Sequence, residues 1–182
     1  MPDQVIEPLP ISDVVFIVNE WGSAPRAACG ESGDPYPSVL DAPDGGLRSA
    51  ARHSDAELTE VADLLHPVFE APSGFACAER VNTLMNVAGL VSQLEAAEWD
   101  VSRVWRTARP GRELLSSALL AVVMQLEDDP DARRLGTCTG AACADVYVDA
   151  SPGGRRRYCS LICQNRARTR AYRARQAEHA AR

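Results

Sequence analysis

The sequence predicts a mainly α-helical protein, with a helical N-terminal domain over residues 1–130 and a small cysteine-containing module over residues 131–182. Three observations support this prediction. Apolar residues recur at helical spacing in the first part, four of the six cysteines lie close together near the C-terminus, and the net charge changes sign between the two parts. The length of 182 residues suits one core and one small appendage, because domains commonly hold roughly 100 to 150 residues.

Three segments of the first part have apolar residues at helical spacing: residues 54–72, 76–99 and 110–128. Ser54 and Glu57 fit a capping box at the start of the first segment. Pro110 suits the first position of the third segment. The middle of that third segment is apolar on all sides, which predicts a buried helix.

Two other segments of the first part are less regular. Val14–Val18 is an apolar run too short to distinguish a buried strand from the first turn of a helix. Residues 22–46 are rich in Gly, Pro, Ser and Asp, which predicts a long loop. Because long loops are often functional, Asn19, Glu20 and Trp21 beside it are candidates to line a ligand pocket. Capping and packing explain the same three residues.

Charge is distributed unevenly along the chain. Residues 133–182 hold 11 Arg against three acidic residues, a net charge of +8. Residues 1–132 hold eight Arg against 22 acidic residues, a net charge of −14. The basic C-terminal part therefore predicts an anionic partner, and the acidic first part of the same chain is one candidate for it.

The composition argues against several classes of protein. No apolar run approaches the ~18 residues that a membrane-spanning helix needs, and the N-terminal residues lack the features of a secretory signal. We therefore expect a cytoplasmic protein that does not bind membranes. The three histidines are scattered, and the sequence contains no Gly-rich phosphate loop, catalytic triad or carboxylate pair. We expect no enzymatic activity.

Four cysteines near the C-terminus form two close pairs. Four residues separate Cys138 from Cys143, three separate Cys159 from Cys163, and fifteen lie between the pairs. Two such pairs can meet on one tetrahedral ion, and four thiolates favour a structural Zn²⁺ without an open position for catalysis. An iron–sulfur cluster and four unligated thiols are the alternatives. Zinc would also stabilise a piece of about 45 residues that has few apolar side chains.

The residues around these pairs predict their local structure. Gly140 permits the tight turn of a knuckle between the first two cysteines. The residues around Val146 alternate between apolar and polar, and a Ser-Pro-Gly-Gly turn leads to a second short run ending at Tyr158, which predicts a β-hairpin. Cys159 and Cys163 are spaced for one side of the first turn of a helix. Knuckle, hairpin and helix together predict a treble-clef-like zinc module.

The last cysteine begins a motif of a known family. Residues 163–166 read Cys-Gln-Asn-Arg, between RRRYCS and RARTRAYRAR, and this text resembles the CGNR zinc finger. Gln164 replaces the glycine of that motif, and the final pair is spaced by three residues where the family is expected to have four. The resemblance implies a helical N-terminal domain of the ABATE type, whose motif is similar to FIVNEW at Phe16–Trp21. That family is regarded as stress-induced transcription regulators, which implies DNA binding.

The arginines of the module are the candidate contacts with nucleic acid. On a helical wheel they form two stripes with alanines between them, and small alanines let a helix approach a surface closely. Three consecutive arginines add a cluster on the predicted hairpin. The candidate set is Arg155, Arg156, Arg157, Asn165, Arg166, Arg168, Arg170, Arg173 and Arg175. We expect salt-dependent binding to DNA phosphates, with RNA as a second candidate.

The sequence therefore predicts a zinc-dependent DNA-binding transcription regulator, associated with the nucleoid when it binds DNA. The alternative is a protein-interaction module that docks on an acidic partner or on residues 1–130, since treble-clef modules serve both uses. Several questions stay open at this stage: the DNA target, formation of a homodimer, a small-molecule effector of residues 1–130, and shielding of the basic module by the acidic part.

Overall fold

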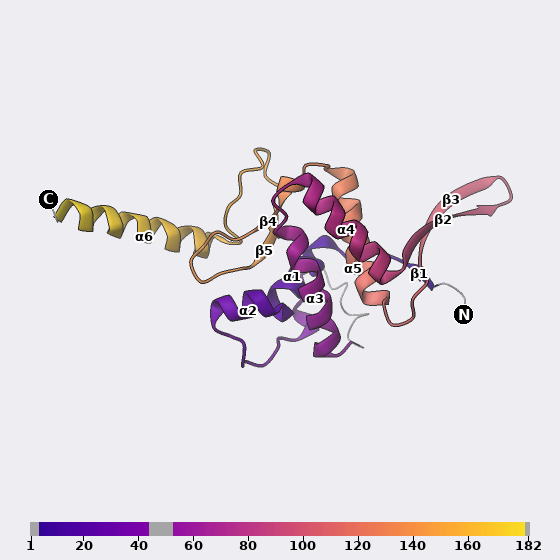
Figure 1. The fold of residues 1–182 in the computed structure, drawn as a ribbon, viewed down its shortest axis with the longest axis horizontal. Coiled ribbons are helices and arrows are strands. Elements are labelled where there is room, and N and C mark those ends of the chain that lie inside the picture. Colours follow the sequence, from indigo (N-terminus) through magenta and orange to yellow (C-terminus); the bar gives the residue numbers. More distant parts are fainter. Residues whose placement is uncertain (1–3, 44–52, 181–182) are drawn as a thin grey trace.

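The computed structural model describes residues 4–43 and 53–180 (Figure 1). These residues form six α-helices and five strands, so the mainly α prediction holds. Helices make up the centre of the molecule, a two-stranded arm projects at one end, and the last helix projects at the other (Figure 1). No helix in the described part of the chain combines the length and the apolar character that crossing a membrane requires.

Four helices enclose the hydrophobic core: α1 (Ile11–Trp21), α3 (Asp55–Phe69), α4 (Gly74–Ala88) and α5 (Glu113–Asp128). The run at residues 14–18 is helical and lies within α1, where Val14, Ile17 and Val18 are completely buried. As predicted, the middle of α5 is buried, with its buried residues between Leu114 and Val122. It begins at Glu113 and not at Pro110.

The capping box at the start of α3 is confirmed. The Ser54 hydroxyl accepts a hydrogen bond from the Glu57 amide at 3.3 Å, and the Glu57 carboxylate accepts one from the Ser54 amide at 2.8 Å. The bond that the Glu57 carboxylate accepts from the Ser54 amide, followed by one from the Ser54 hydroxyl, lowers the pKa of Glu57. The two bonds of the capping box also satisfy two of the amides that every helix leaves without an internal partner.

The predicted helix over residues 76–99 is wrong beyond residue 88. Gly89 ends α4 with a left-handed φ of 65°. The chain then forms a β-hairpin, β2 (Leu90–Ala97) and β3 (Asp100–Thr107), with β1 (Gln4–Ile6) paired antiparallel on the other side of β3. Apolar residues at 90, 91 and 94 fit a helix as well as a strand, and pairing with β3 selects the strand.

The predicted loop over residues 22–46 contains a helix, α2 (Ser23–Cys29), and a short 3₁₀ turn, η1 (Val39–Asp41). Its residues 44–46 lie outside the described residues. The buried Arg26 side chain orders this segment by donating hydrogen bonds to three main-chain carbonyl oxygens, while its guanidinium lies 4.4 Å from the centre of the Tyr36 ring.

The C-terminal part is built onto the helical core. A 3₁₀ turn, η3 (Ala132–Arg134), leads into β4 (Leu135–Thr137), which pairs antiparallel with β5 (Val146–Val148). Leu135 and Val146 are buried in the same hydrophobic cluster as α1 and α3. The core thus positions the segment that carries the first two cysteines.

Candidate metal centre and arginine helix

The four predicted cysteines converge on one point. Their sulfur atoms all lie within 4.8 Å of one another. The Sγ of Cys159 is 3.6 Å from that of Cys143 and 3.5 Å from that of Cys163. Four sulfurs around a tetrahedral Zn²⁺ at ~2.3 Å are about 3.8 Å apart, so these separations suit zinc.

The first pair lies in a tight knuckle after β4. The Cys138 amide donates to the carbonyl oxygen of Asp145 at 2.8 Å, and the Gly140 amide donates to the Cys138 sulfur at 3.4 Å. A Cβ on Gly140 would lie 3.2 Å from that sulfur. Ala142 has a left-handed φ of 56°. The chain thus folds back sharply enough for both thiols to face the same point.

The second pair lies at the start of the last helix, α6 (Leu161–Ala180). Cys159 precedes the helix, and Cys163 is buried in its first turn. The Ser160 hydroxyl accepts a hydrogen bond from the Cys163 amide at 3.3 Å and so begins the helix. The predicted helix is confirmed, and its positive end favours thiolates.

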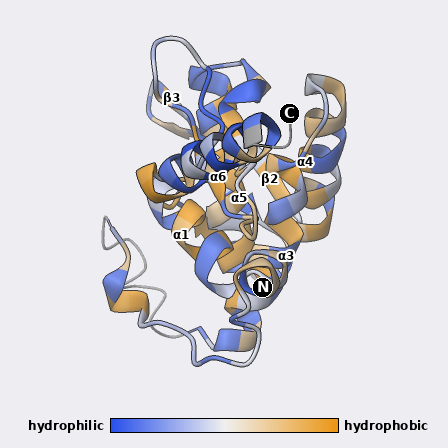
Figure 2. Ribbon diagram, turned by 90° about the vertical axis from the view of Figure 1, so that its left-hand side faces the viewer, coloured by the Kyte–Doolittle hydropathy of each residue, from blue (hydrophilic) through white to orange (hydrophobic). Residues whose placement is uncertain are grey.

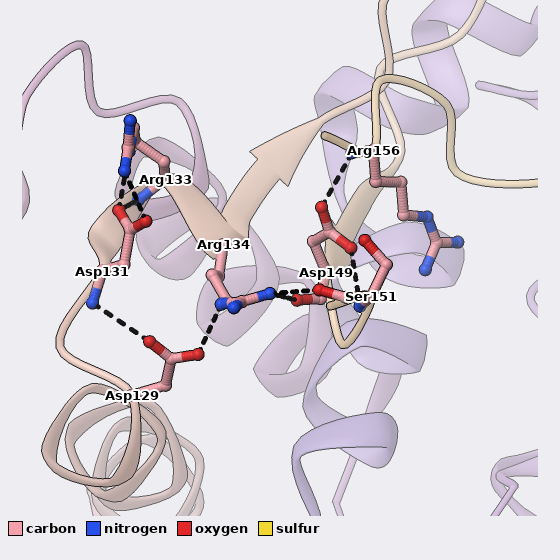
Figure 3. A network of polar contacts seen from close by, with 7 residues as sticks. All are labelled: Asp129, Asp131, Arg133, Arg134, Asp149, Ser151 and Arg156. Atoms are coloured by element: carbon pink, nitrogen blue, oxygen red, sulfur yellow. Dashed lines mark hydrogen bonds and ion pairs between the residues drawn. The ribbon is translucent and has the colours of Figure 1, made fainter. Parts of the chain in front are cut away.

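The strand pair of this module differs from the predicted hairpin. β5 pairs with β4, which precedes the first cysteine, and residues 149–158, all described, contain no strand. The Asp149 carboxylate instead closes a loop by accepting hydrogen bonds from the amides of Ser151 at 2.9 Å and Arg156 at 2.7 Å (Figure 3). Hydrogen bonding with the Ser151 side chain, followed by the bond from the Arg156 amide, lowers the pKa of Asp149.

Arg134 connects the end of α5 to the same loop (Figure 3). Its guanidinium forms an ion pair with the Asp129 carboxylate. Its Nη1 donates to the carbonyl oxygens of Asp149 at 2.9 Å and Ser151 at 2.6 Å. Asp129 directly follows α5, so Arg134 links the helical core to the loop between the cysteine pairs.

The cluster of thiols favours a cation. Without an ion, burial raises the pKa of the Cys159 thiol to about 12 and also raises the pKa of Cys143. Burial acts in the same direction on Cys138, but hydrogen bonds from the amides of Cys159 and Gly140 outweigh it and lower the pKa of Cys138. A Zn²⁺ ion supplies the positive charge that allows all four thiols to ionise.

Residues 134–176 match the CGNR zinc finger family. The match includes all four cysteines and most of α6. With the cluster geometry, it identifies this module as a CGNR zinc finger with a structural Zn²⁺. Gln164 and the three-residue final spacing are therefore compatible with the finger. No curated protein matches the chain. The ABATE-like character of Phe16–Trp21, which lies outside the match, stays a prediction.

Most of the predicted nucleic-acid contacts lie exposed on or just before α6. The exposed arginines are Arg155, Arg156, Arg157, Arg166, Arg168, Arg170, Arg173 and Arg175, and Asn165 is exposed as well. Every residue from 168 to 179 is exposed, and Figure 2 shows α6 as predominantly hydrophilic. Within the described part of the chain, none of the five α6 arginines takes part in an ion pair.

Arg156 differs from its two neighbours because its guanidinium binds the finger itself. It donates to the carbonyl oxygens of Val148 at 3.2 Å, Tyr158 at 2.9 Å and Cys159. It also lies 4.8 Å from the centre of the Tyr147 ring. These contacts hold the chain just before α6, so Arg156 has a structural role.

Two side chains of the helical core anchor the finger, and the sequence did not identify their partners. Nδ2 of Asn19 donates to the Val146 carbonyl oxygen at 3.1 Å, and Oδ1 accepts from the Val146 amide at 2.7 Å. Nε2 of the buried His66 lies 2.8 Å from the Ala144 carbonyl oxygen. Because Ala144 follows the ligand Cys143, α1 and α3 together position the first knuckle.

The three candidate pocket residues of α1 do not line one cavity in the structure. Asn19 lines a cavity of about 480 Å³ between α1 and β5, whose described lining includes neither Glu20 nor Trp21. Trp21 is completely buried, and its Nε1 donates to Oδ1 of Asp55 at 2.9 Å. Burial, followed by repulsion from Asp145, raises the pKa of Glu20. Of the three residues, Asn19 alone lines the described cavity, and the buried Trp21 belongs to the core.

Proposed function

We propose that this protein is a DNA-binding transcription regulator whose CGNR finger contacts nucleic-acid phosphates through its arginines. The observation that carries this proposal is the exposure of α6. This 20-residue helix is about 30 Å long and carries five arginines without ion-pair partners in the described chain. Unpaired guanidinium groups bind phosphates through charge-assisted hydrogen bonds.

Zinc has a structural role in this proposal. Cys163 joins the first turn of α6 to the cluster, so the ion fixes the direction in which the helix leaves the finger. Four thiolates complete the tetrahedral coordination of zinc and leave no position for a reacting water molecule. The finger therefore acts by binding and not by catalysis.

The placement of the acidic first part supports the same function. Residues 1–132 have a net charge of −14, which repels phosphates. α6 projects away from the helical core (Figure 1), so DNA on α6 is separated from most of that charge. The resemblance of Phe16–Trp21 to the ABATE motif supports a regulatory role for residues 1–130, with a small molecule as effector.

One observation favours the alternative of a protein-interaction module. Leu161 and Ile162 at the start of α6 are 74% and 64% exposed, and an acidic partner protein could cover them together with the arginines. Docking of α6 on residues 1–130 lacks support, because the described helix is exposed beyond its first two turns. Shielding of the arginines by the acidic part lacks support for the same reason.

Titration of the full-length, zinc-loaded protein with labelled duplex DNA tests the proposal. We expect binding that weakens steeply between about 50 and 200 mM salt, because bound arginines release counterions. Arg170→Ala and Arg173→Ala should each lower the salt slope by about one. Arg103→Ala, in the hairpin arm, is the control and should bind as the wild type does.

Polyglutamate serves as the competing ligand in the same titration. Absence of salt-sensitive DNA binding would contradict the proposal. Tighter binding of polyglutamate than of DNA at the same salt concentration would favour the protein-interaction alternative.

A further inference from the structure

One exposed face of α6 carries neutral side chains. Successive residues of a helix are about 100° apart, so Ile162, Asn165, Thr169 and Gln176 fall within about 60° of one another. All four are exposed. The first three line one furrow on the helix surface together with Arg166, Arg170 and Arg173, which flank this neutral face on one side. No arginine falls within its arc of about 60°.

The opposite face of α6 is turned toward the finger. It carries the ligand Cys163 and the alanine row Ala167, Ala171 and Ala174, which line a cleft together with the knuckle residues 139–141. The sequence suggested that the alanines would lie against a nucleic acid. The cleft places this row on the side of the finger, but Ala171 and Ala174 are exposed, so the interpretation stays a prediction.

Arginines border the neutral face on both sides. Arg166, Arg170 and Arg173 follow one border, and Arg168 and Arg175 follow the other, about 180° away across the neutral face. Arg155 and Arg157, both exposed in the loop before α6, extend the second border. They line a cleft with Leu161 and Gln164, which lie on that side of the helix.

This arrangement matches the major groove of B-form DNA. An α-helix with its side chains is about 10–12 Å wide, and the major groove is about 12 Å wide with a phosphate backbone on each side. Two arginine rows on opposite sides of a helix can reach both backbones. A helix that lay against only one backbone would use a single basic face.

The neutral face has the side chains that recognise base edges. The amides of Asn165 and Gln176 can each make two hydrogen bonds with adenine, and the Thr169 hydroxyl can bond to several bases. The methyl groups of Thr169 and Ile162 suit the thymine methyl group. A-form RNA offers no comparable groove, because its major groove is too deep and narrow for a helix.

We infer that α6 is a recognition helix for duplex DNA, in which Asn165, Thr169 and Gln176 select the base sequence and the two arginine rows hold the backbones. This inference rests on the proposed function and adds sequence selectivity to it. It also assigns selection and general affinity to different residues of the same helix.

Selection of duplexes from a random library by the full-length, zinc-loaded protein tests the inference. We expect an enriched motif that binds at least about 1,000-fold more tightly than a scrambled duplex at the same salt concentration. Asn165→Ala and Gln176→Ala should each reduce this preference by about 5- to 150-fold, without changing the salt slope or the affinity for the scrambled duplex. Arg170→Ala should weaken both duplexes equally.

Gln164→Ala is the matched control, since Gln164 is an amide next to Asn165 on another side of the helix, and it should keep the preference. Zinc content and circular dichroism verify that each exposed-site variant is folded. Salt-dependent binding without a sequence preference would overturn the inference and leave the proposed function standing. A preference unchanged in both Asn165→Ala and Gln176→Ala, or tighter binding of duplex RNA, would also overturn it. Failure to bind any duplex would overturn both.

Discussion

The side-chain amide of Asn19 makes two hydrogen bonds with the main chain of Val146, much as a neighbouring strand would. Nδ2 is 3.1 Å from the Val146 oxygen, and Oδ1 is 2.7 Å from the Val146 nitrogen. In the described sheet β5 pairs only with β4, so Asn19 takes the place of a partner on the side of α1. One side chain of the helical core thereby fixes the strand that follows the first knuckle.

Replacement of Asn19 should destabilise the junction between core and finger. Val146 is only 1% exposed, so Asn19→Ala leaves its amide and carbonyl without partners and should lower the free energy of unfolding by about 2 kcal/mol. Urea denaturation measures the loss. Asn82→Ala, at an exposed position of α4, should change this free energy by less than about 0.5 kcal/mol. Equal stability of the two variants would contradict the role of Asn19.

Gly136 in β4 should not tolerate a side chain. A Cβ at this position would lie 2.7 Å from the Tyr147 ring, whose hydroxyl donates to the Arg156 carbonyl oxygen at 2.6 Å and so holds the ring in place. Gly136→Ala should therefore cost roughly 1 to 3 kcal/mol in thermal or chemical unfolding. Gly153→Ala is the matched control, because the nearest side-chain atom would be 3.9 Å away. A loss of the same size in both variants would refute the steric explanation.

The sequence was informative where the signals were local. Ser54 and Glu57 are three residues apart and form their capping box within one turn. The helical spacing of α5 holds over four turns. In contrast, the hairpin β2–β3 depends on contacts between distant residues. The Thr107 hydroxyl, for example, donates to the carbonyl oxygen of Ala88 at 2.8 Å, across the point where α4 ends. Apolar spacing alone cannot distinguish a strand from a helix there.

The same distinction applies to the zinc site. The spacing of the cysteines predicted their convergence, because each pair closes a short local turn. The strand partner β4 and the anchors could not be derived in this way, since 127 residues separate Asn19 from Val146 and 78 separate His66 from Ala144. A polar Asn19 directly after the apolar run at residues 14–18 was the only available signal, and it did not identify its partner.

Substitution of Arg156 should lower stability, whereas substitution of the neighbouring Arg155 should lower only the affinity for DNA. Arg156→Ala removes donors to three carbonyl oxygens and should cost roughly 1.5 to 3 kcal/mol, with weaker retention of zinc. Arg156→Lys should recover little, because an ammonium group cannot reproduce the planar fork. Arg155→Ala should leave stability within about 0.5 kcal/mol but lower DNA affinity. Unfolding and DNA titrations of the three variants measure both properties, and a stability loss in Arg155→Ala would contradict this division.

Zinc affinity should increase with pH. In the absence of the ion, the pKa of Cys159 is raised to about 12 and that of Cys143 is raised as well, so both thiols carry protons at neutral pH. Zinc binds thiolates and must displace these protons, so the apparent affinity should rise by about tenfold per pH unit for each proton displaced. Competition with a chromophoric chelator between about pH 6 and pH 8 measures this slope, and proton release in weak buffer gives an independent count.

Two cysteine variants complete the zinc test. Cys159→Ser removes a ligand and should abolish tight zinc binding, and the freed start of α6 should lose helical signal in circular dichroism. Cys29→Ser, at an exposed cysteine outside the cluster, should keep the zinc content and pH slope of the wild type. A zinc affinity independent of pH, or equal zinc content in the two variants, would contradict a four-thiolate site. Because Cys163 ties α6 to the ion, loss of zinc should also remove salt-sensitive DNA binding in the same preparation.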